Sequence, residues 1–585
     1  MIEDVHEPLE LYKTHFKEAH ARNTSELFED LVRQSGVDEN ANIVTVKQLR
    51  ELETGVSSES SASKWWGILR VCTIAALAFS LLYVYANNYS LMWMIVPAGL
   101  FGAAIYKLNK LIADVNARLK NLEQQRDAKR EEAWQQMAPL NRLYKWDILA
   151  KLLEKTVPRI NLDPYFSNGR LDELRNSFGW NDQFNQGRSI VFSHSGVING
   201  NPFILAQTLE HSMGTKTYHG SRQISWTERQ RDSSGRWTTV TRHQTLNASV
   251  EKPFPEYGHR SFIIYGNEAA PDLSFSRQPS NLSTLGDGWI ANWKKDRAVK
   301  KLENKSRNIE NGGGFTVMAN REFDAMFGAT DRDHEVQFRL LFTPLAQQEM
   351  HKLLKDKEVG YGDDFEFEKR RMINLVEPAH MVSTDISAQP EKFYSYELAY
   401  ARRFFNDYHN HFFKSFFFGI APLLAIPLYQ QHRSHNDIYK GVNSSHSCFW
   451  EHETIANHFG EAVFQHPECI TRSLLKTRSK VEADNTQTVQ VTASGFKGIN
   501  RTAVVSVYGG DGHYHDVRVN WVEYIPVKHQ SHIIVREKQN FPAEGEVKPS
   551  EIDDGSWQTA FKQRGVDLSK AVLRRSVVSA VLPQV

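Results

Sequence analysis

The longest run of hydrophobic positions begins at Trp65 and ends near Ile112. Residues 66–86 carry one charge, Arg70, and as a helix they span about 30 Å, which matches a bilayer's hydrocarbon core. A polar turn follows, and a second apolar stretch, 91–106, returns in the opposite direction. The pattern predicts a transmembrane helical hairpin over 65–112, in preference to a hairpin buried inside a soluble protein.

Aromatic and basic residues frame this hairpin. Aromatic side chains at both ends of the two helices are typical of membrane interfaces. The residues predicted to anchor the hairpin are Trp65, Trp66, Arg70, Tyr83, Tyr85, Trp93, Tyr106 and Lys107. Basic residues flank only the open end of the hairpin. The positive-inside rule therefore predicts a multi-pass protein of the cell membrane with its soluble domains in the cytoplasm.

Two further patterns predict helix packing in this region. Small residues recur at every fourth position, which favours close contact between helices in a membrane. The predicted packing residues are Cys72, Ala76, Ser80, Gly99 and Ala103. Beyond the hairpin, Leu108, Ile112, Val115, Leu119 and Leu122 form a short heptad seam. We expect a helical stalk over 113–180 that packs on a neighbouring helix, with self-association or a protein partner as the alternative use of a coiled coil.

The remaining segments divide by pattern. Residues 1–54 predict short helices, and the Ser-rich residues 55–64 predict a flexible linker. Residues 185–360 predict an α+β domain. Its expected strands are 189–192, 215–228, 236–250, 261–265, 315–319 and 334–342, with a hairpin turn at 232–235, a basic helix at 289–311 stopped by Gly312–Gly314, and a helix at 345–355.

The last third predicts helices and then strands. Residues 361–480 read as helical and contain an apolar segment, 415–429, which is short for a membrane span and holds Pro422 and Pro427. We expect it to be buried or interfacial; if it spans, the C-terminal part lies outside. Residues 481–585 predict a C-terminal β-rich domain and tail, with strands at 486–492, 502–508, 513–522 and 531–537. The expected fold class is α+β, with a helical membrane region followed by two β-rich soluble domains.

Composition narrows the function. Lys and Arg number 70 and Asp and Glu 69, so no basic surplus favours nucleic acid as a partner. The three cysteines, Cys72, Cys448 and Cys469, are too few to indicate a disulfide framework. A basic helix holds the best charged patch: Lys294, Lys295, Arg297, Lys300 and Lys301. It is either a solvated helix face or a contact for anionic lipid headgroups.

Candidate chemistry is weak. His452, Glu453 and His458 imitate a zinc-protease motif, but the histidines are six apart where that motif needs four. Ser193–Ser195 lies outside any nucleophile-elbow pattern, and Gly312–Gly314 lacks the lysine of a phosphate loop. His513 and His515 share one predicted strand face but have no third ligand nearby. We therefore predict no metal and no cofactor and assign no catalytic residue.

A family resemblance supports the same architecture. The stretches FSHSGVINGNPFILAQTLEH and REFDAMFGATDRDHEVQFRLLFTPLAQQEMHKLL resemble segments of an uncharacterised bacterial membrane-protein family, a domain of unknown function. The resemblance covers about residues 60–370. It implies an N-terminal transmembrane hairpin before a cytoplasmic α+β domain, and it implies no catalytic residues.

These patterns favour a membrane-anchored, cytoplasmic-facing interaction or scaffold protein, whose partners are the lipid bilayer and another protein. One alternative is a membrane-bound, hydrolase-like enzyme with a site assembled from distant residues, using His452, Glu453 and His458 from a non-helical loop. Another is a subunit of a transport or envelope-assembly complex, with 415–429 entering the bilayer.

Overall fold

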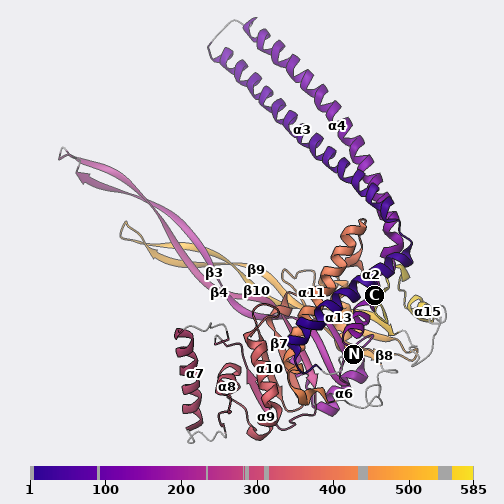
Figure 1. The fold of residues 1–585 in the computed structure, drawn as a ribbon. Coiled ribbons are helices and arrows are strands. Elements are labelled where there is room, and N and C mark those ends of the chain that lie inside the picture. Colours follow the sequence, from indigo (N-terminus) through magenta and orange to yellow (C-terminus); the bar gives the residue numbers. More distant parts are fainter. Residues whose placement is uncertain are drawn as a thin grey trace. The chain divides into compact units, whose positions relative to one another are not determined.

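A computed structural model describes most of the chain: residues 5–87, 92–231, 233, 235–280, 282–283, 289–307, 315–431, 446–537 and 556–583. These residues combine helices with two antiparallel sheets, which confirms the α+β class at this level (Figure 1). The chain forms two compact units. The first comprises Met1–His20, Trp146–Ala388 and His411–Val585, and the second Ala21–Lys145 and Gln389–Asn410.

The α-helices described are α1 Pro8–Leu11, α2 Lys17–Ser35, α3 Glu39–Ala86, α4 Met92–Asn141, α5 Ile148–Thr156, α6 Asn168–Phe178, α7 Trp289–Arg307, α8 Arg321–Phe327, α9 Glu335–Leu341, α10 Pro344–Lys355, α11 Leu398–Leu424, α13 Phe449–Phe459, α14 Glu461–Phe464 and α15 Ser556–Gln563. Short turns of other helix types are η1 Tyr12–Phe16, η2 Asp182–Asn185, η4 Ala379–Val382, η5 Pro390–Phe393, η6 Pro427–Gln430 and η8 Leu568–Lys570. The division between the two units falls within α2 and α11.

The strands are β1 Ile160–Leu162, β2 Arg188–Ile198, β3 Asn201–Arg231, β4 Trp237–Gly266, β5 Ser274–Arg277, β6 Phe365–Arg370, β7 Ile373–Pro378, β8 Leu474–Val481, β9 Gln487–Tyr508, β10 Tyr514–Glu537, β11 Val572–Arg574 and β12 Val577–Val581. One sheet has the order β1-β2-β3-β4-β7-β6-β5, and the other β11-β12-β10-β9-β8. Asn199 and Gly200 join β2 to β3, both with positive φ, as a two-residue hairpin turn requires.

Alternation along the strands of the seven-stranded sheet buries both of its faces. Ile204 of β3 and Ile264 of β4 join a core with α6 and with Trp450 of α13. On the opposite face, Phe203 packs on Phe416 of α11. The apolar segment 415–429 is therefore buried against this sheet, as predicted, with many of its side chains almost fully covered.

Helix α13 also contacts the five-stranded sheet. Its Ile455 and Ala456 pack with residues of β8, β9, β10 and β12, while α15 covers the other face through Phe561. Alternation along β10 explains the two cores, because Ile533 points toward α13 and Ile534 toward α15. The body of the first unit is thus layered, with α13 between the two sheets.

In the second unit, α3 and α4 lie side by side (Figure 1). Arg130 bonds Glu53 at 2.7 Å, Ser63 bonds Asn116 at 2.8 Å, and Arg70 bonds Asn109 at 3.4 Å. Along these three contacts the residue numbers rise in α3 and fall in α4, so the two helices are antiparallel. The heptad seam faces α3: Leu108 and Val115 are buried, and its other members are partly buried.

The predicted linker 55–64 is wrong, because these residues lie inside α3. Serine has a modest helix propensity, but packing on α4 supplies what propensity does not. A Cβ added at Gly55 would lie 3.7 Å from Leu122, and Ser63 bonds Asn116. Tertiary contact therefore keeps a Ser-rich segment helical.

Two strand predictions are also wrong. Residues 334–342 form α9, since His334 caps its first turn and Phe338, Leu341 and Phe342 repeat at helical spacing and are buried. Residues 315–319 form no strand. The predicted helix at 345–355 is confirmed as α10, which Thr343 caps. The basic helix is confirmed as α7, whereas Gly312–Gly314 lies outside the described residues.

Several predicted strands merge into two long hairpins. Residues 215–228 lie within β3, and 236–250 and 261–265 are parts of the continuous strand β4. Pro253 and Pro255 lie between the two predicted segments, and they were the reason that two strands were predicted in place of one. A proline is tolerated on a free strand edge, and β4 pairs with β7 only at Ile263–Gly266. The four predicted C-terminal strands are likewise β9 and β10.

Candidate functional site

The predicted anchor residues lie along α3 and α4. Trp65, Tyr83, Tyr85 and Tyr106 are between 58% and 74% exposed in the protein alone. Trp66 is partly buried, Arg70 and Lys107 are exposed, and Trp93 lies on α4. Among the described residues one helix, α3, is long and apolar enough to cross a membrane. Its most apolar 18-residue window has a mean hydropathy of 2.0, and none of that window is buried.

The predicted small-residue packing face does not form the α3–α4 contact. Cys72, Ala76, Gly99 and Ala103 are exposed, and Ser80 alone is partly buried. No atom lies within 4 Å of a Cβ built at Gly99. On α3 the partly buried face instead includes Thr73, Leu77 and Leu81. On α4 the heptad seam continues backwards through Ile105 and Phe101, which are also partly buried.

The two long hairpins extend past the layered body as an arm, which we define as residues 212–256 of β3–β4 and 498–524 of β9–β10 (Figure 1). Cross-strand pairing is continuous from Phe203↔Tyr265 to Arg231↔Trp237 in the first hairpin, and from Gln487↔Val535 to Tyr508↔Tyr514 in the second. At about 3.3 Å per residue, the arm strand of β3 is about 60 Å long.

The arm is a two-layer structure with a narrow core of its own. Ile224, Leu246 and Ala248 of the first hairpin pack on Val517 and Val519 of the second. A Cβ at Gly220 would lie 2.3 Å from the carbonyl oxygen of Arg518, so only glycine allows this close approach. The layers are also tied by hydrogen bonds from Arg222 to the carbonyl of Asp516 (2.9 Å) and from the Gly510 amide to Gln244 (2.7 Å).

The outer surface of the arm is polar, and its ends are aromatic. The residues of β3 that point away from the second hairpin include Thr217, His219, Ser221, Gln223 and Ser225, all exposed. The second hairpin turns at Gly509–Gly512, beside Trp226 and Gln244. The first hairpin continues beyond this point as a ribbon without a covering layer.

That ribbon comprises residues 227–231 and 237–241, and nearly all of its side chains are exposed. Trp237 is 65% exposed, and the guanidinium of Arg231 lies 5.1 Å from its ring centre. At the end of the second hairpin, Tyr508 and Tyr514 are 59% and 72% exposed. Exposed aromatic side chains beside arginine are the composition of protein-binding hot spots. The sequence contained this signal, but alternation alone did not show that the ribbon is uncovered.

The predicted headgroup residues lie on α7 but not on one face. Lys294, Arg297, Lys300 and Lys301 are exposed. Lys295 is on the packed side, where its ammonium lies 3.9 Å from Glu322 with 14% of the side chain exposed. The same helix also carries Trp289 and Trp293, which a search for charged patches does not reveal and which are 78% and 52% exposed on the outer face.

The zinc-protease-like residues do not converge. They lie in α13, which is helical, so the enzyme hypothesis loses the non-helical loop it required. His452 and Glu453 are fully buried, and burial lowers the pKa of His452 to about 4. His452 Nε2 lies 3.0 Å from Ser447 Oγ, and Glu453 accepts the Ile190 amide at 2.9 Å. His458 packs its ring against Trp146 instead.

The Ser193–Ser195 segment holds a structural network. Ser195 Oγ donates to Asp163 at 2.8 Å, and Asp163 accepts two bonds of 3.0 Å from the buried Arg170. His194 Nε2 lies 2.7 Å from the carbonyl of Ile386, and burial, reinforced by the nearby Arg575 guanidinium, holds the His194 pKa well below its usual value. The carboxylate that binds Ser195 already neutralises an arginine, so it is poorly suited to activate a nucleophile.

A small hollow near the end of α10 contains another histidine–carboxylate pair. Its lining includes Tyr361, Asp364 and Phe418. His380 Nδ1 lies 2.6 Å from Asp364, and its Nε2 lies 2.9 Å from the carbonyl of Ser415. Tyr361 stacks on the imidazole at 3.7 Å. Both ring nitrogens are engaged within the protein, so the pair serves packing rather than proton transfer to a substrate.

One buried lysine has an altered pKa without an acidic partner. Lys369 is fully buried on β6, where Nζ donates to the carbonyls of Ala269 (3.0 Å) and Arg371. Burial lowers its pKa to about 7. A lysine of this kind can act as a nucleophile where it meets solvent. Here its ammonium is enclosed by backbone and by the ring of Tyr429.

Within the described ranges, no group of three or more His, Cys, Asp or Glu side chains is placed to hold a metal ion. His515 pairs instead with Asp511 at 2.9 Å, and Cys448 and Cys469 are free thiols. Comparison with models of known families, with curated proteins and with solved structures finds no match to this chain. The exposed surfaces, and above all the arm, are thus the candidate functional site.

Proposed function

We propose that this chain is a membrane-anchored interaction protein, held in the bilayer by the apolar ends of α3 and α4, which binds a partner protein through the tip of its two-hairpin arm. This proposal keeps the two spans expected from the sequence. It also keeps the soluble domains on the cytoplasmic side, where the basic residues Lys64, Lys107 and Lys110 flank the helices.

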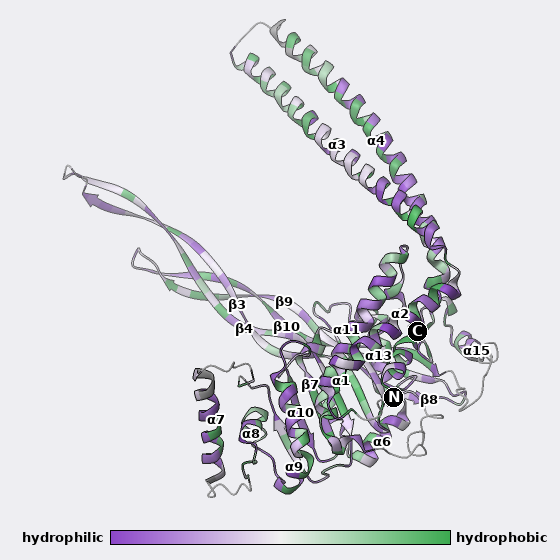
Figure 2. Ribbon diagram, in the orientation of Figure 1, coloured by the Kyte–Doolittle hydropathy of each residue, from purple (hydrophilic) through white to green (hydrophobic). Residues whose placement is uncertain are grey.

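The exposure of α3 supports the anchor. Figure 2 shows hydrophobic residues concentrated where α3 ends and α4 begins, while polar residues dominate the distant halves of both helices. Ile74, Phe79, Leu82 and Leu100 are between 47% and 73% exposed. Water would penalise so large an apolar surface, whereas hydrocarbon favours it.

The uncovered ribbon at the end of β3–β4 is the observation that carries the binding role. A two-stranded ribbon is marginally stable in water without a packed face. This one still exposes Trp237 and Arg231, and it stands at the end of an arm whose core contributes nothing to the layered body. A partner that covers Trp237 would supply the missing layer and gain an aromatic anchor.

A photo-crosslinking amino acid in place of Trp237, in the full chain and in its native membrane, tests the arm. We expect a discrete covalent adduct, weakened when Arg231 and Tyr514 are replaced by serine. Tyr400 is a matched control, because it is 46% exposed but lies outside the arm. Identical adducts from Trp237 and Tyr400, or none from Trp237, would contradict the proposal.

A further inference from the structure

Helix α7 carries aromatic and basic side chains on one exposed face. At 100° per residue, Trp289, Trp293 and Lys300 lie within about 40° of one another, and Arg297 and Lys301 border them. All five side chains are exposed. The guanidinium of Arg297 lies 5.4 Å from the ring centre of Trp293. The face therefore combines two indole rings and Lys300 with positive charge along one edge, while the exposed Asp296 lies on the other edge.

The opposite face fixes α7 to the rest of its unit. Leu302 is buried, and Lys305 donates to the carbonyl of Thr330 at 3.0 Å. The side chains that hold the helix are thus separate from those that face solvent. Lys295 belongs to the holding side, through Glu322.

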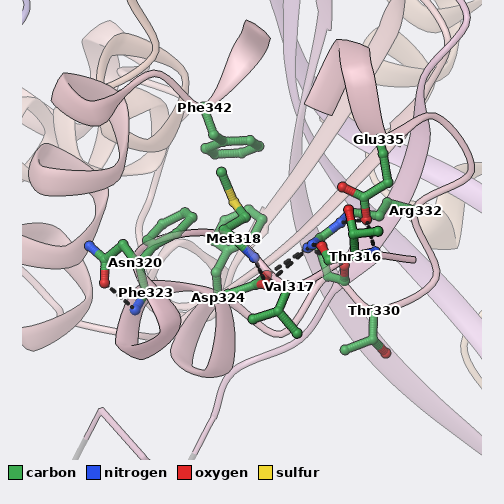
Figure 3. A network of polar contacts seen from close by, with 12 residues as sticks. Thr316, Val317, Met318, Asn320, Phe323, Asp324, Thr330, Arg332, Glu335 and Phe342 are labelled. Atoms are coloured by element: carbon green, nitrogen blue, oxygen red, sulfur yellow. Dashed lines mark hydrogen bonds and ion pairs between the residues drawn. The ribbon is translucent and has the colours of Figure 1, made fainter. Parts of the chain in front are cut away.

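A buried charge network joins the elements next to α7. Arg332 is fully buried and binds Asp324 at 2.6 Å, Glu335 at 2.8 Å and the carbonyl of Thr316 at 2.7 Å (Figure 3). This network joins α8, α9 and the segment before them. Such a buried charge network holds the backbone of α8 and α9 in place, and α8 is an element on which α7 packs.

We propose that the outer face of α7 is a docking surface for an anionic lipid bilayer. Charge complementarity selects this partner: the α7 sequence holds seven basic and two acidic residues, in a chain whose net charge is only +1. Each Lys or Arg near an anionic surface adds to the attraction. Indole rings favour the headgroup region, where their apolar area leaves water while the N–H stays hydrated.

Two other occupants explain the face less well. A nucleic acid would account for the positive charge, but the chain as a whole has a net charge of only +1, without the basic surplus typical of proteins that bind nucleic acid. A protein partner would account for the tryptophans, but binding cores are depleted of lysine, and Lys300 lies between these rings with Lys301 at the edge of the same face. Tryptophan bordered by lysine is characteristic of interfacial helices.

This inference does not rest on the binding role of the arm. It gains from the anchor, since a second contact made by an anchored chain is intramolecular and acts at a high effective concentration. Loss of α7 docking would leave the spanning helices in place. Failure of the anchor would instead release the whole chain from the membrane, so the two failures are distinguishable.

Quenching of tryptophan emission by brominated lipid tests the inference. The full chain is placed in vesicles of brominated phosphatidylcholine, with or without phosphatidylglycerol, and compared with Trp289→Phe/Trp293→Phe. We expect phosphatidylglycerol to add quenching in the wild-type chain and this increment to be lost in the double variant. Trp237→Phe is the matched control, because it also removes one exposed tryptophan (65%) but should retain the increment.

A charge variant, Lys300→Gln/Lys301→Gln, separates the electrostatic contribution. It should lose most of the phosphatidylglycerol increment while keeping both tryptophans, and salt should have the same effect on the wild type. These side chains are exposed, so an unchanged circular dichroism spectrum verifies the fold. An increment that survives in Trp289→Phe/Trp293→Phe would overturn the proposal. So would a change in the emission of these two tryptophans that follows addition of an oligonucleotide but not addition of anionic lipid.

Discussion

The helix pair α3–α4 and the two-hairpin arm are built on the same plan and present opposite surfaces. Each is long, antiparallel and internally paired, and each has a thin core of its own: Leu108 and Val115 in the helices, Leu246 and Val517 in the arm. Their outer faces differ. Phe79 on α3 is 73% exposed, whereas the outer face of β3 presents serine, threonine and glutamine.

Internal pairing allows each of these long structures to form with only a thin core. The side chains of its outer face then determine whether water or hydrocarbon stabilises it. Within α3 and α4 the backbone groups of the helix interiors bond to one another, which is what lets a helix enter hydrocarbon. The arm has free strand edges, whose unpaired amides and carbonyls need water or a partner strand. The helices suit a bilayer and the arm suits water, for reasons of backbone as well as side-chain chemistry.

The largest expected effect comes from placing charge on the helical surface. Ile74→Asp/Phe79→Asp should release the chain from the membrane, because each aspartate at the centre of a membrane helix costs about 2.5–3.5 kcal/mol. In water the same exposed changes would be close to neutral. The fraction of chain that resists extraction from membranes by alkaline carbonate measures the effect.

A matched pair in the arm is the control for that experiment. Thr217→Asp and Ser221→Asp lie on an exposed outer face and should leave membrane retention unchanged. If Ile74→Asp/Phe79→Asp behaves like this control, the apolar ends of α3 and α4 do not lie in a bilayer, and the comparison between the two projections loses its main contrast.

The sequence revealed one projection far better than the other. An apolar run is a local property, so the region from Trp65 onward was recognisable from composition and length. The arm depends on pairing between distant segments: Arg222 bonds the backbone of Asp516, 294 positions along the chain. Local alternation predicts a strand but does not name its partner, and Pro253 and Pro255 divided one strand into two.

The second largest effect concerns the body of the first unit, where the strand β10 ends at Glu537 beside β12, at the end opposite to the arm. Burial alone would raise the pKa of this carboxyl, but hydrogen bonds from His446, Ser447 and Gln487 surround it and the pKa is lowered to about 2. Its ordinary value is 4.5. The unfolded chain therefore binds more protons between these values, so the stabilisation is complete above about pH 4.5 and is lost as the pH falls toward 2.

Glu537→Gln should therefore lower the free energy of unfolding by about 3 kcal/mol near neutral pH, at about 1.4 kcal/mol per pKa unit. The difference from wild type should shrink steadily as the pH falls below about 4.5. Denaturant unfolding followed at several pH values measures it. A difference that does not change with pH would mean that the carboxylate charge is not what stabilises this end of the five-stranded sheet.

The buried charged groups were beyond prediction for a similar reason. Arg332 and Asp324 are eight residues apart and looked like ordinary surface residues, yet both are fully buried. Trp289 and Trp293 were visible in the sequence, but their place on the outer face of α7 depends on which face α8 covers. Burial, more than residue type, decides what these side chains do, and burial is a property of the tertiary fold.

A smaller effect is expected within the arm core. Leu246→Ala should cost about 2 kcal/mol, the lower end for a buried leucine, because a narrow two-layer core can partly collapse into the space. Hydrogen exchange should quicken at the arm amides and stay unchanged in the body. Asn247→Ala is the matched control, since the adjacent side chain points outward and is exposed. Equal acceleration in the body would show that the arm is not an independent structural unit.

The smallest effects give the most direct comparison of the helix pair with the arm, because they concern the same residue type at a similar exposed fraction. Trp65 on α3 and Trp237 on the arm are 72% and 65% exposed, so in water either could become serine with less than about 0.5 kcal/mol change in the free energy of unfolding. We expect Trp237→Ser to leave both stability and membrane retention unchanged and to act only on partner binding. Trp65→Ser should reduce retention under mild alkaline extraction, since an interfacial indole is lost. If both substitutions leave membrane retention unchanged, Trp65 does not lie at a membrane interface. Its side chain is then exposed to water, as that of Trp237 is.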